Sequence, residues 1–294
     1  AYGDKEEEGG GRGLENAAGH GPEPVVMVGE LRPGAVGTGG RGGTGGAFVA
    51  SGPEAVAAAD EYLVALDRLA AERVDCNVSV KPTHMGMDLG DDFCHDNILR
   101  IVRKAADLGN FVRIDMEGSP YTARTIDVYR RLRQRHDNVG IVVQAYLHRT
   151  QSDVESLIAN GMGHFRLCKG AYDEPPSIAY REGARVTQAM QELIRTCFSP
   201  EARTLGAYAA IASHDEDVIN FARAYAYQNN VPPTAYEFQM LYGIRRELQT
   251  DLVRRGYRMR IYVPYGTHWY PYYMRRLAER PANLFFFLRA LVGN

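Results

Sequence analysis

The chain has 294 residues, enough for one α/β barrel or two smaller domains with a large core. Its 34 basic and 36 acidic residues nearly balance, so the composition indicates no nucleic acid or other polyanionic partner. The four cysteines lie far apart without CxxC spacing, which is typical of reduced thiols in a cytoplasmic protein and predicts no metal site. No apolar run reaches the roughly 20 residues of a membrane span.

Residues 1–52 form a glycine-rich segment that differs from the rest of the chain. The segment contains more than half of the 31 glycines and shows little apolar periodicity, so we expect it to be largely irregular. Its one strand-like run is residues 24–29, of sequence PVVMVG. We expect residues 53–294 to form the ordered domain.

An amphipathic helix begins near Pro53, since proline is favoured in the first turn of a helix. Apolar residues then recur three and four positions apart. We expect the following residues to form its buried face: Val56, Ala59, Leu63, Leu66 and Ala70. A second helical pattern contains Ile98, Ile101, Ala105 and Leu108 and ends at Gly109.

Seven candidate strands alternate with helical patterns along the chain. They are residues 77–81, 111–117, 140–146, 164–169, 208–214, 234–240 and 258–264. This alternation predicts parallel pairing through right-handed crossovers, in a closed (βα)8 barrel or an open doubly wound sheet. The barrel is favoured because barrel enzymes collect their chemistry at the carboxyl ends of the strands. Polar residues occupy these ends: Lys81, Asp115, Gln144, Lys169, His214, Gln239 and Tyr262.

Residues 269–280 predict a helix near the C-terminus, with Pro271 in its first turn. Helical spacing places four polar residues on one face: Tyr272, Arg275, Arg276 and Glu279. Two adjacent guanidinium groups can bind a small carboxylate through paired hydrogen bonds. A solvated basic face is an equally good interpretation of this stretch by itself.

Several motifs, read in order, resemble those of the proline dehydrogenase family. They are Val-Ser-Val-Lys81, Ile-Asp115-Met-Glu117, Val-Gln144-Ala-Tyr146, Arg166-Leu-Cys-Lys169-Gly-Ala-Tyr172, Ala-Ser213-His214-Asp, Tyr236-Glu-Phe-Gln-Met-Leu241-Tyr-Gly, Ile-Tyr262-Val-Pro-Tyr-Gly and the stretch from Tyr272 to Glu279. The resemblance extends from about residue 53 to the C-terminus. It implies a distorted (βα)8 barrel whose last helix lies over the barrel mouth.

The resemblance also implies an activity, which is the oxidation of L-proline to 1-pyrroline-5-carboxylate by hydride transfer to N5 of FAD. Electrons would then pass to a membrane quinone, through a peripheral contact at the inner face of the membrane. The residues that match the family's substrate site are Lys81, Leu241, Tyr262, Tyr272, Arg275 and Arg276. Catalytic positions match Asp115 and Arg166, with Arg166 beside the flavin N5. The FAD site matches Met116, Gln144, Arg166, Lys169, Gly170, Ala171, Ser213, His214 and Glu279.

The N-terminal part of the chain, before Pro53, departs from the family pattern. The family has its first strand directly before the helix that begins here at Pro53, and this place holds the glycine tract of residues 34–46. We therefore expect the first strand to be replaced or disrupted, with an open or strained barrel and weakened flavin retention. Residues 25–28 are the candidate replacement, and an intact strand paired between those at 77–81 and 258–264 would contradict the expectation.

Two other functions fit the residues. A barrel lyase could use Lys81 or Lys169 to form a Schiff base, because lysines at strand ends serve this role. Alternatively, a non-catalytic barrel could bind an amino acid after losing its flavin because of the altered first strand.

The predicted carboxylate clamp can be tested by single substitution. Arg275→Met or Arg276→Met should raise the KM for proline much more than it lowers flavin content, because each removes a partner of the substrate carboxylate. Steady-state kinetics and the visible absorption spectrum measure the two effects. Unchanged kinetics in both variants would contradict the clamp.

Overall fold

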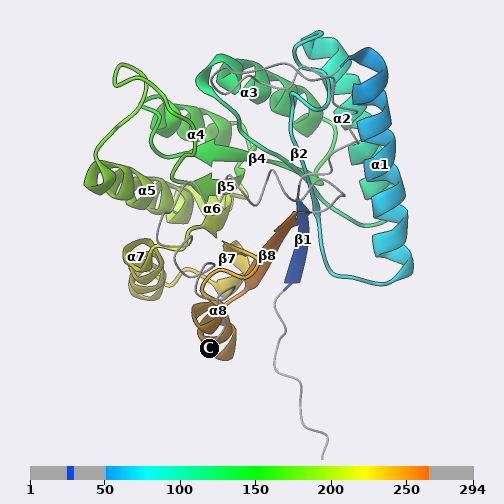
Figure 1. The fold of residues 1–294 in the computed structure, drawn as a ribbon. Coiled ribbons are helices and arrows are strands. Elements are labelled where there is room, and N and C mark those ends of the chain that lie inside the picture. The colour runs from blue at the N-terminus through cyan, green and yellow to red at the C-terminus, as the bar shows by residue number, and fades with distance from the viewer. Residues whose placement is uncertain (1–24, 30–50, 265–294) are drawn as a thin grey trace, which may run out of the picture.

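A computed structural model of the chain describes residues 25–29 and 51–264. The described strands form a closed barrel in which sequential neighbours pair in parallel and the last strand pairs with the first (Figure 1). The α/β barrel predicted from the sequence is therefore confirmed. The strands are β1 (Val25–Gly29), β2 (Val78–Val80), β3 (Val112–Ile114), β4 (Val139–Gln144), β5 (His164–Cys168), β6 (Tyr208–Ala212), β7 (Tyr236–Leu241) and β8 (Met259–Pro264).

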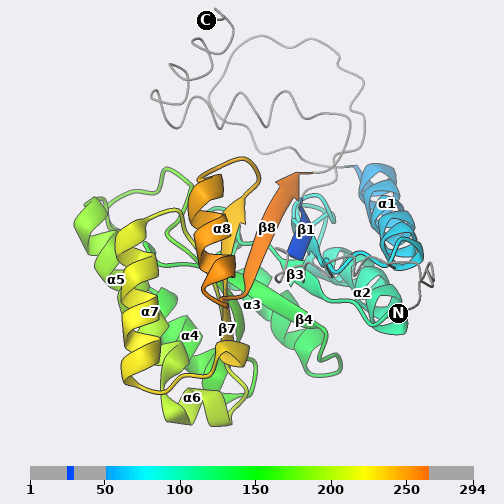
Figure 2. The same cartoon turned by 90° about the horizontal axis from the view of Figure 1, so that it is seen from below.

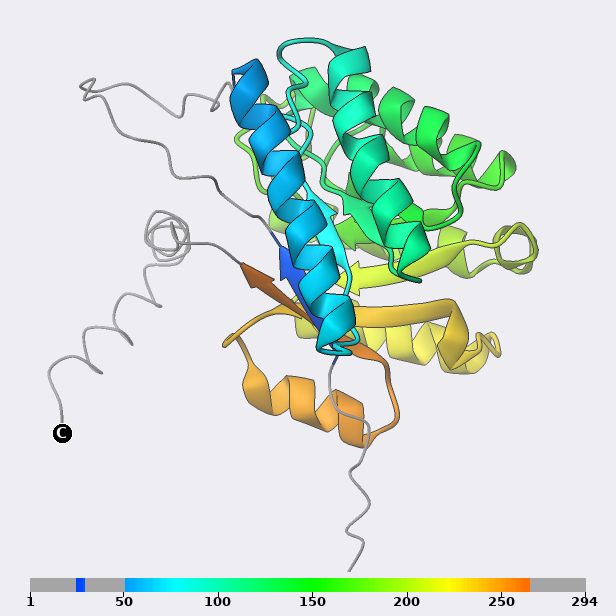
Figure 3. The same ribbon diagram turned by 90° about the vertical axis from the view of Figure 1, so that its right-hand side faces the viewer.

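Helices surround this barrel on its outside (Figure 2). The helices are α1 (Gly52–Ala71), α2 (Asp91–Asp107), α3 (Ser119–Arg133), α4 (Thr150–Ala159), α5 (Gly183–Phe198), α6 (Pro200–Thr204), α7 (Glu216–Gln228) and α8 (Arg246–Arg254), with a 3-10 turn, η1 (Pro233–Ala235). On one flank α1 and α2 lie side by side (Figure 3). The predicted helix over the barrel mouth lies outside the described residues.

Strand β1 closes the barrel by pairing with β2 on one side and with β8 on the other. Val28 pairs with Val78 of β2, and the whole of β1 pairs with β8, from Val25 opposite Arg260 to Gly29 opposite Pro264. The expectation of a disrupted first strand and an open barrel is therefore wrong, because the short apolar run at 25–29 supplies the missing strand. The division of the chain at residue 52 remains a prediction.

The buried face of α1 is rotated relative to the predicted one. Val56 is 37% exposed and Ala70 is also exposed, whereas Tyr62 is completely buried. The hydroxyl of Tyr62 donates a hydrogen bond of 2.7 Å to the main-chain carbonyl of Ser79 in β2. This inward aromatic side chain sets the orientation of the helix, and Ala55, Ala59 and Leu66 are buried with it.

The second predicted helix is confirmed as α2. Its apolar stripe of Ile98, Ile101 and Ala105 is fully buried. Gly109 follows the helix with a positive φ of 64°, a left-handed conformation that glycine adopts without strain.

Alternate residues of β5 face opposite sides of the barrel wall. Phe165 and Leu167 are completely buried and belong to the core between the strands and the helices. The residue between them, Arg166, donates hydrogen bonds inside the barrel to side chains of β2 and β7 and to Asp115, which directly follows β3. The apolar side of β5 thus packs against the helices, while its inner side carries the guanidinium group of Arg166.

Phe165→Ala should lower the free energy of unfolding by about 3–5 kcal/mol, because it removes a fully buried aromatic ring and leaves a cavity in the core. Chemical denaturation monitored by circular dichroism measures the loss. Val64→Ala, at a 60% exposed position of α1, is the control and should change the stability little. Equal effects of the two substitutions would contradict this assignment of the core.

Candidate functional site

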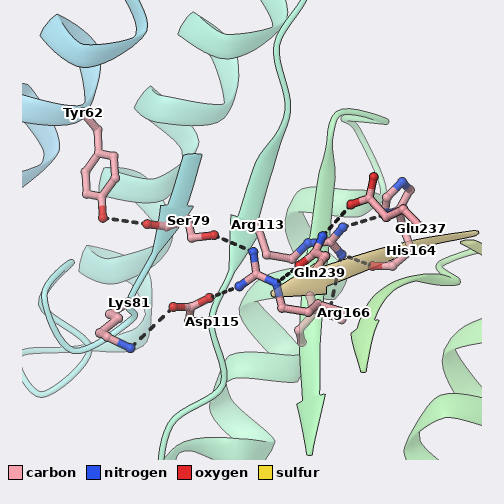
Figure 4. A network of polar contacts seen from close by, with 10 residues as sticks. Tyr62, Ser79, Lys81, Arg113, Asp115, His164, Arg166, Glu237 and Gln239 are labelled. Carbon is pink, nitrogen blue, oxygen red and sulfur yellow. Dashed lines mark hydrogen bonds and ion pairs between the residues drawn. The ribbon is translucent and has the colours of Figure 1, made fainter. Parts of the chain in front are cut away.

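The site is built around the guanidinium group of Arg166, which lies inside the barrel and is 5% exposed. Its Nη1 donates to Oδ1 of Asp115 at 2.8 Å, its Nη2 to Oγ of Ser79 at 2.8 Å and its Nε to Oε1 of Gln239 at 2.7 Å (Figure 4). Ser79 belongs to β2, Gln239 belongs to β7, and Asp115 directly follows β3. Arg166 is therefore held from three directions.

Asp115 is shared between two cations. Its Oδ1 accepts from Arg166, and its Oδ2 lies 3.4 Å from the ammonium nitrogen of Lys81. The side chain of Asp115 is only 10% exposed and that of Lys81 is 21% exposed. Lys81 and Asp115, which follow the neighbouring strands β2 and β3, thus meet at the carboxyl end of the barrel as the strand-end pattern predicted. Arg166 joins them from within β5, which the pattern did not predict.

Tyr262 and Leu241 lie beside this cluster. The two residues are paired across β7 and β8. The Cζ atom of Arg166 lies 5.4 Å from the centre of the Tyr262 ring, a cation–π geometry. Both residues are half-buried, so they are placed to form part of a pocket wall.

A second polar layer lies beneath the cluster. Glu237 of β7 accepts from Arg260 at 2.9 Å and from the Gln239 amide at 2.5 Å. Burial acts to raise the pKa of Glu237, but the charge and hydrogen bond of Arg260 outweigh it and the pKa is lowered. Glu237 is therefore an ionised carboxylate at neutral pH.

Arg113 of β3 is also part of this lower layer and is 1% exposed. Its Nη1 donates to the carbonyls of His164 and Ile141, at 2.8 and 3.3 Å. Burial, followed by the charge of Arg166, lowers the pKa of Arg113 to about 9. Burial and the charge of Arg113 hold the pKa of His164 well below its usual range, so its ring is neutral.

Sequence reasoning missed the residues that support Arg166. Ser79, Arg113, Glu237 and Arg260 were not predicted as site residues, and Gln239 was identified only as a polar strand end. A signal was present, because Arg113 and Asp115, or Glu237 and Gln239, alternate along otherwise apolar strands and so share one face. Which face they share was not decided by the pattern.

Among the residues matched to an FAD site that the structure describes, Arg166 lies within β5, and the others lie at or just after the ends of four consecutive strands, β3 to β6. Met116 and Gln144 are buried, and the Gln144 amide donates to the carbonyl of Glu117 at 2.9 Å. Ser213 accepts from the main-chain N–H of Asp215 at 3.1 Å. The ring of His214 accepts from the main-chain N–H of Leu241 at 3.0 Å through Nε2.

The Lys169 ammonium donates to Thr187 at 2.7 Å and to Asp215 at 2.5 Å. Asp215 is also the N-cap of α7, where its side chain accepts from the N–H of Asp217. Partial burial acts to raise the pKa of Asp215, but the bond from Lys169 and the helix cap outweigh it, so the pKa is lowered. This pair fixes the Lys169 ammonium at the edge of the barrel mouth.

Gly170 makes the turn after β5 with a φ of +127°. A Cβ atom at this position would lie 2.3 Å from the ring of Tyr146, so only glycine fits. The next residue, Ala171, is exposed. The turn therefore leaves accessible main chain next to the Lys169 cation.

This set of donors fits a flavin nucleotide. The Lys169 cation, an accessible main chain at Gly170 and the buried amide of Gln144 lie at the ends of the paired strands β4 and β5. The Arg166 cation lies within β5, inside the barrel. FAD carries phosphates, and its isoalloxazine ring gains negative charge on reduction, so cations and N–H donors suit both parts.

Glu117 lies at the same edge and accepts from the N–H and hydroxyl of Thr83, at 2.9 and 2.8 Å. Burial raises the pKa of Glu117, although the charge of Lys81 and the bonds from Thr83 act in the opposite direction. Glu117 therefore holds the loop that follows β2 through Thr83, two residues after Lys81.

The predicted carboxylate clamp lies outside the described residues. Its four members are Tyr272, Arg275, Arg276 and Glu279, and their roles remain predictions. Among residues 25–29 and 51–264, no group of three or more His, Cys, Asp or Glu residues is placed to hold a metal ion. None of the helices in these ranges has the length and apolarity that a membrane span requires.

Comparison with known proteins agrees with this geometry. The sequence model of the proline dehydrogenase family matches residues 46–289. Proline dehydrogenase 1 of Bacillus subtilis subsp. natto is 37% identical over 247 residues, which are 84% of this chain and 80% of that protein. A proline dehydrogenase of Deinococcus radiodurans is 34% identical over 252 residues, covering 84% and 79% of the two chains.

The fold is also that of solved proline utilization A (PutA) structures. PutA from Bdellovibrio bacteriovorus, inactivated by N-propargylglycine, superimposes with a TM-score of 0.70 at 25% identity. The match covers 83% of this chain but 28% of that one, so the chain spans little more than a quarter of the length of that PutA. On the family match and the identity over most of its length, the chain belongs to the proline dehydrogenase family of oxidoreductases.

Proposed function

We propose that the chain oxidises L-proline to 1-pyrroline-5-carboxylate with bound FAD as the hydride acceptor. The observation that carries the proposal is the buried Arg166, held by three strands and sharing Asp115 with Lys81. Family membership supports the choice of proline as substrate. Electrons then pass to a membrane quinone from a peripheral position on the cytoplasmic face, a part that rests on the family resemblance.

FAD, when bound, supplies the hydride acceptor. Arg166 places a fixed positive charge in the mouth of the barrel, where it stabilises negative charge that develops on the product side of the transfer. Its geometry does not need to reorganise during the reaction, because three side chains already hold it.

Lys81 binds the carboxylate of proline together with Arg275 and Arg276. Its ammonium is the most exposed member of the ion cluster, so a substrate can reach it. Asp115 balances part of the positive charge and prevents repulsion between Lys81 and Arg166. Leu241 and Tyr262, with Tyr272, close the pocket around the ring of the substrate.

The cofactor is held along the arc from β3 to β6. Lys169 and the turn at Gly170 and Ala171 bind its anionic part, while Gln144 and Met116 pack near its ring. Ser213, His214 and Glu279 complete the site. In the described structure Lys169 is already positioned by Asp215, which fits a binding role better than a mobile surface role.

A lyase acting through a Schiff base fits less well. A Schiff-base lysine attacks as a neutral amine. Lys81 and Lys169 each lie in an ion pair with a carboxylate, Asp115 and Asp215 respectively. The non-catalytic alternative rested on a disrupted first strand, and β1 is paired on both sides.

A visible spectrum tests the proposed function directly. The purified chain, supplied with FAD, should show flavin absorption that is bleached by L-proline without oxygen, because hydride transfer reduces the flavin. D-proline is the control and should not bleach it, since the reversed stereocentre directs the hydride away from the flavin when the carboxylate is clamped. A chain that takes up no FAD, or whose FAD is unaffected by L-proline, would contradict the proposal.

A double-mutant cycle tests the shared carboxylate. Asp115→Asn should lower the free energy of unfolding by about 3–5 kcal/mol, because it leaves Arg166 and Lys81 as neighbouring cations without their carboxylate. Adding Lys81→Met should restore part of this stability by removing one cation. The KM for proline of the double variant should exceed that of the unsubstituted chain, because Lys81 no longer binds the substrate carboxylate. Chemical denaturation and steady-state kinetics measure the two effects.

If the two substitutions lower the stability additively, Asp115 does not couple the two cations.

A further inference from the structure

The orientation of the Gln239 amide is fully determined by its neighbours. The Nε of Arg166 can only donate, so it must contact the amide oxygen. The carboxylate of Glu237 can only accept, so it must contact the amide nitrogen. Gln239 is 2% exposed and Glu237 is 4% exposed, so water does not compete for these bonds.

We propose that Gln239 is a positioning residue, itself oriented by Glu237, that holds Arg166 through a neutral acceptor and so preserves the positive charge that acts on the flavin. The proposal rests on the proposed flavin-dependent function. It assigns a reason for an amide at this position, where a carboxylate would bind the guanidinium more strongly.

Charge placement supports the assignment. Within the described residues, Asp115 is the carboxylate in contact with Arg166, and it is shared with Lys81. A second carboxylate directly on Arg166 would offset the charge that stabilises the reduced cofactor. The negative charge of Glu237 lies one step further away and is paired with Arg260.

The orientation of Arg166 is therefore fixed through a series of contacts that runs from Arg260 through Glu237 and Gln239. None of these contacts places a second carboxylate directly on Arg166. Glu237 fixes the amide, and the amide fixes the guanidinium. Asp115 and Ser79 hold the other two nitrogens of the guanidinium from the opposite side of the barrel.

Two substitutions at Gln239 separate position from charge. Gln239→Met removes the acceptor, so hydrogen exchange at Nε of Arg166, followed by NMR in the purified full chain, should become at least tenfold faster. Gln239→Glu keeps an acceptor and so keeps this protection. It should however lower the ratio of reduced to oxidised flavin about tenfold at a fixed redox poise. This change corresponds to a reduction potential of the flavin that is lower by about 30 mV for two electrons.

Two further variants serve as controls. Gln239→Glu places a carboxylate next to Glu237 and can prevent folding. The double variant Glu237→Gln with Gln239→Glu keeps the net charge of the unsubstituted chain. It should also lower the ratio of reduced to oxidised flavin. Gln151→Met removes an amide from α4 that bonds to Glu155 and Thr196, away from the barrel interior. It should change neither the exchange at Arg166 nor the flavin ratio.

The outcomes are distinct. Unchanged Arg166 exchange in Gln239→Met would overturn the proposal, and so would an unchanged flavin ratio in both the single and the double variant that contain Gln239→Glu. A wild-type chain that binds no flavin would instead overturn the proposed function, and the exchange measurement alone would then decide whether Gln239 positions Arg166.

Discussion

The buried guanidinium of Arg166 is the constraint on which the site depends. A charge inside a barrel is tolerated only when hydrogen bonds and an opposite charge replace the water that it loses. Asp115, Ser79 and Gln239 supply these contacts from three strands. The same contacts that make the charge tolerable also fix its direction.

The closed barrel is what brings these partners together. Ser79, Asp115 and Gln239 are far apart in sequence, on strands β2 and β7 and at the end of β3. They converge because β1 joins β2 to β8 and completes the ring. A short apolar run in a glycine-rich segment therefore has a structural consequence for a site to which it is not adjacent in sequence.

The barrel interior contains two layers of ion pairs that differ in burial. The lower pair, Glu237 and Arg260, is almost completely buried and sets the orientation of Gln239. The upper cluster around Asp115 includes the partly exposed Lys81 and is accessible from the barrel mouth. Structural support thus comes from the buried layer, and the substrate binding that we propose falls to the partly exposed layer.

The sequence by itself predicted the alternating α/β architecture, favoured a barrel and indicated the family, since period-two runs, helical stripes and ordered motifs are local features. It did not determine that residues 25–29 close the barrel or that β3 ends at Ile114 rather than at residue 117. It also indicated Asp115 and Lys81 as partners at one edge. Only the tertiary structure decided that Gln239 orients Arg166 and that Tyr62 rotates α1 inward, because each depends on distances between strands or helices far apart in the chain. Alternation shows which residues share a face of a strand, but only the closed sheet shows what each face contacts.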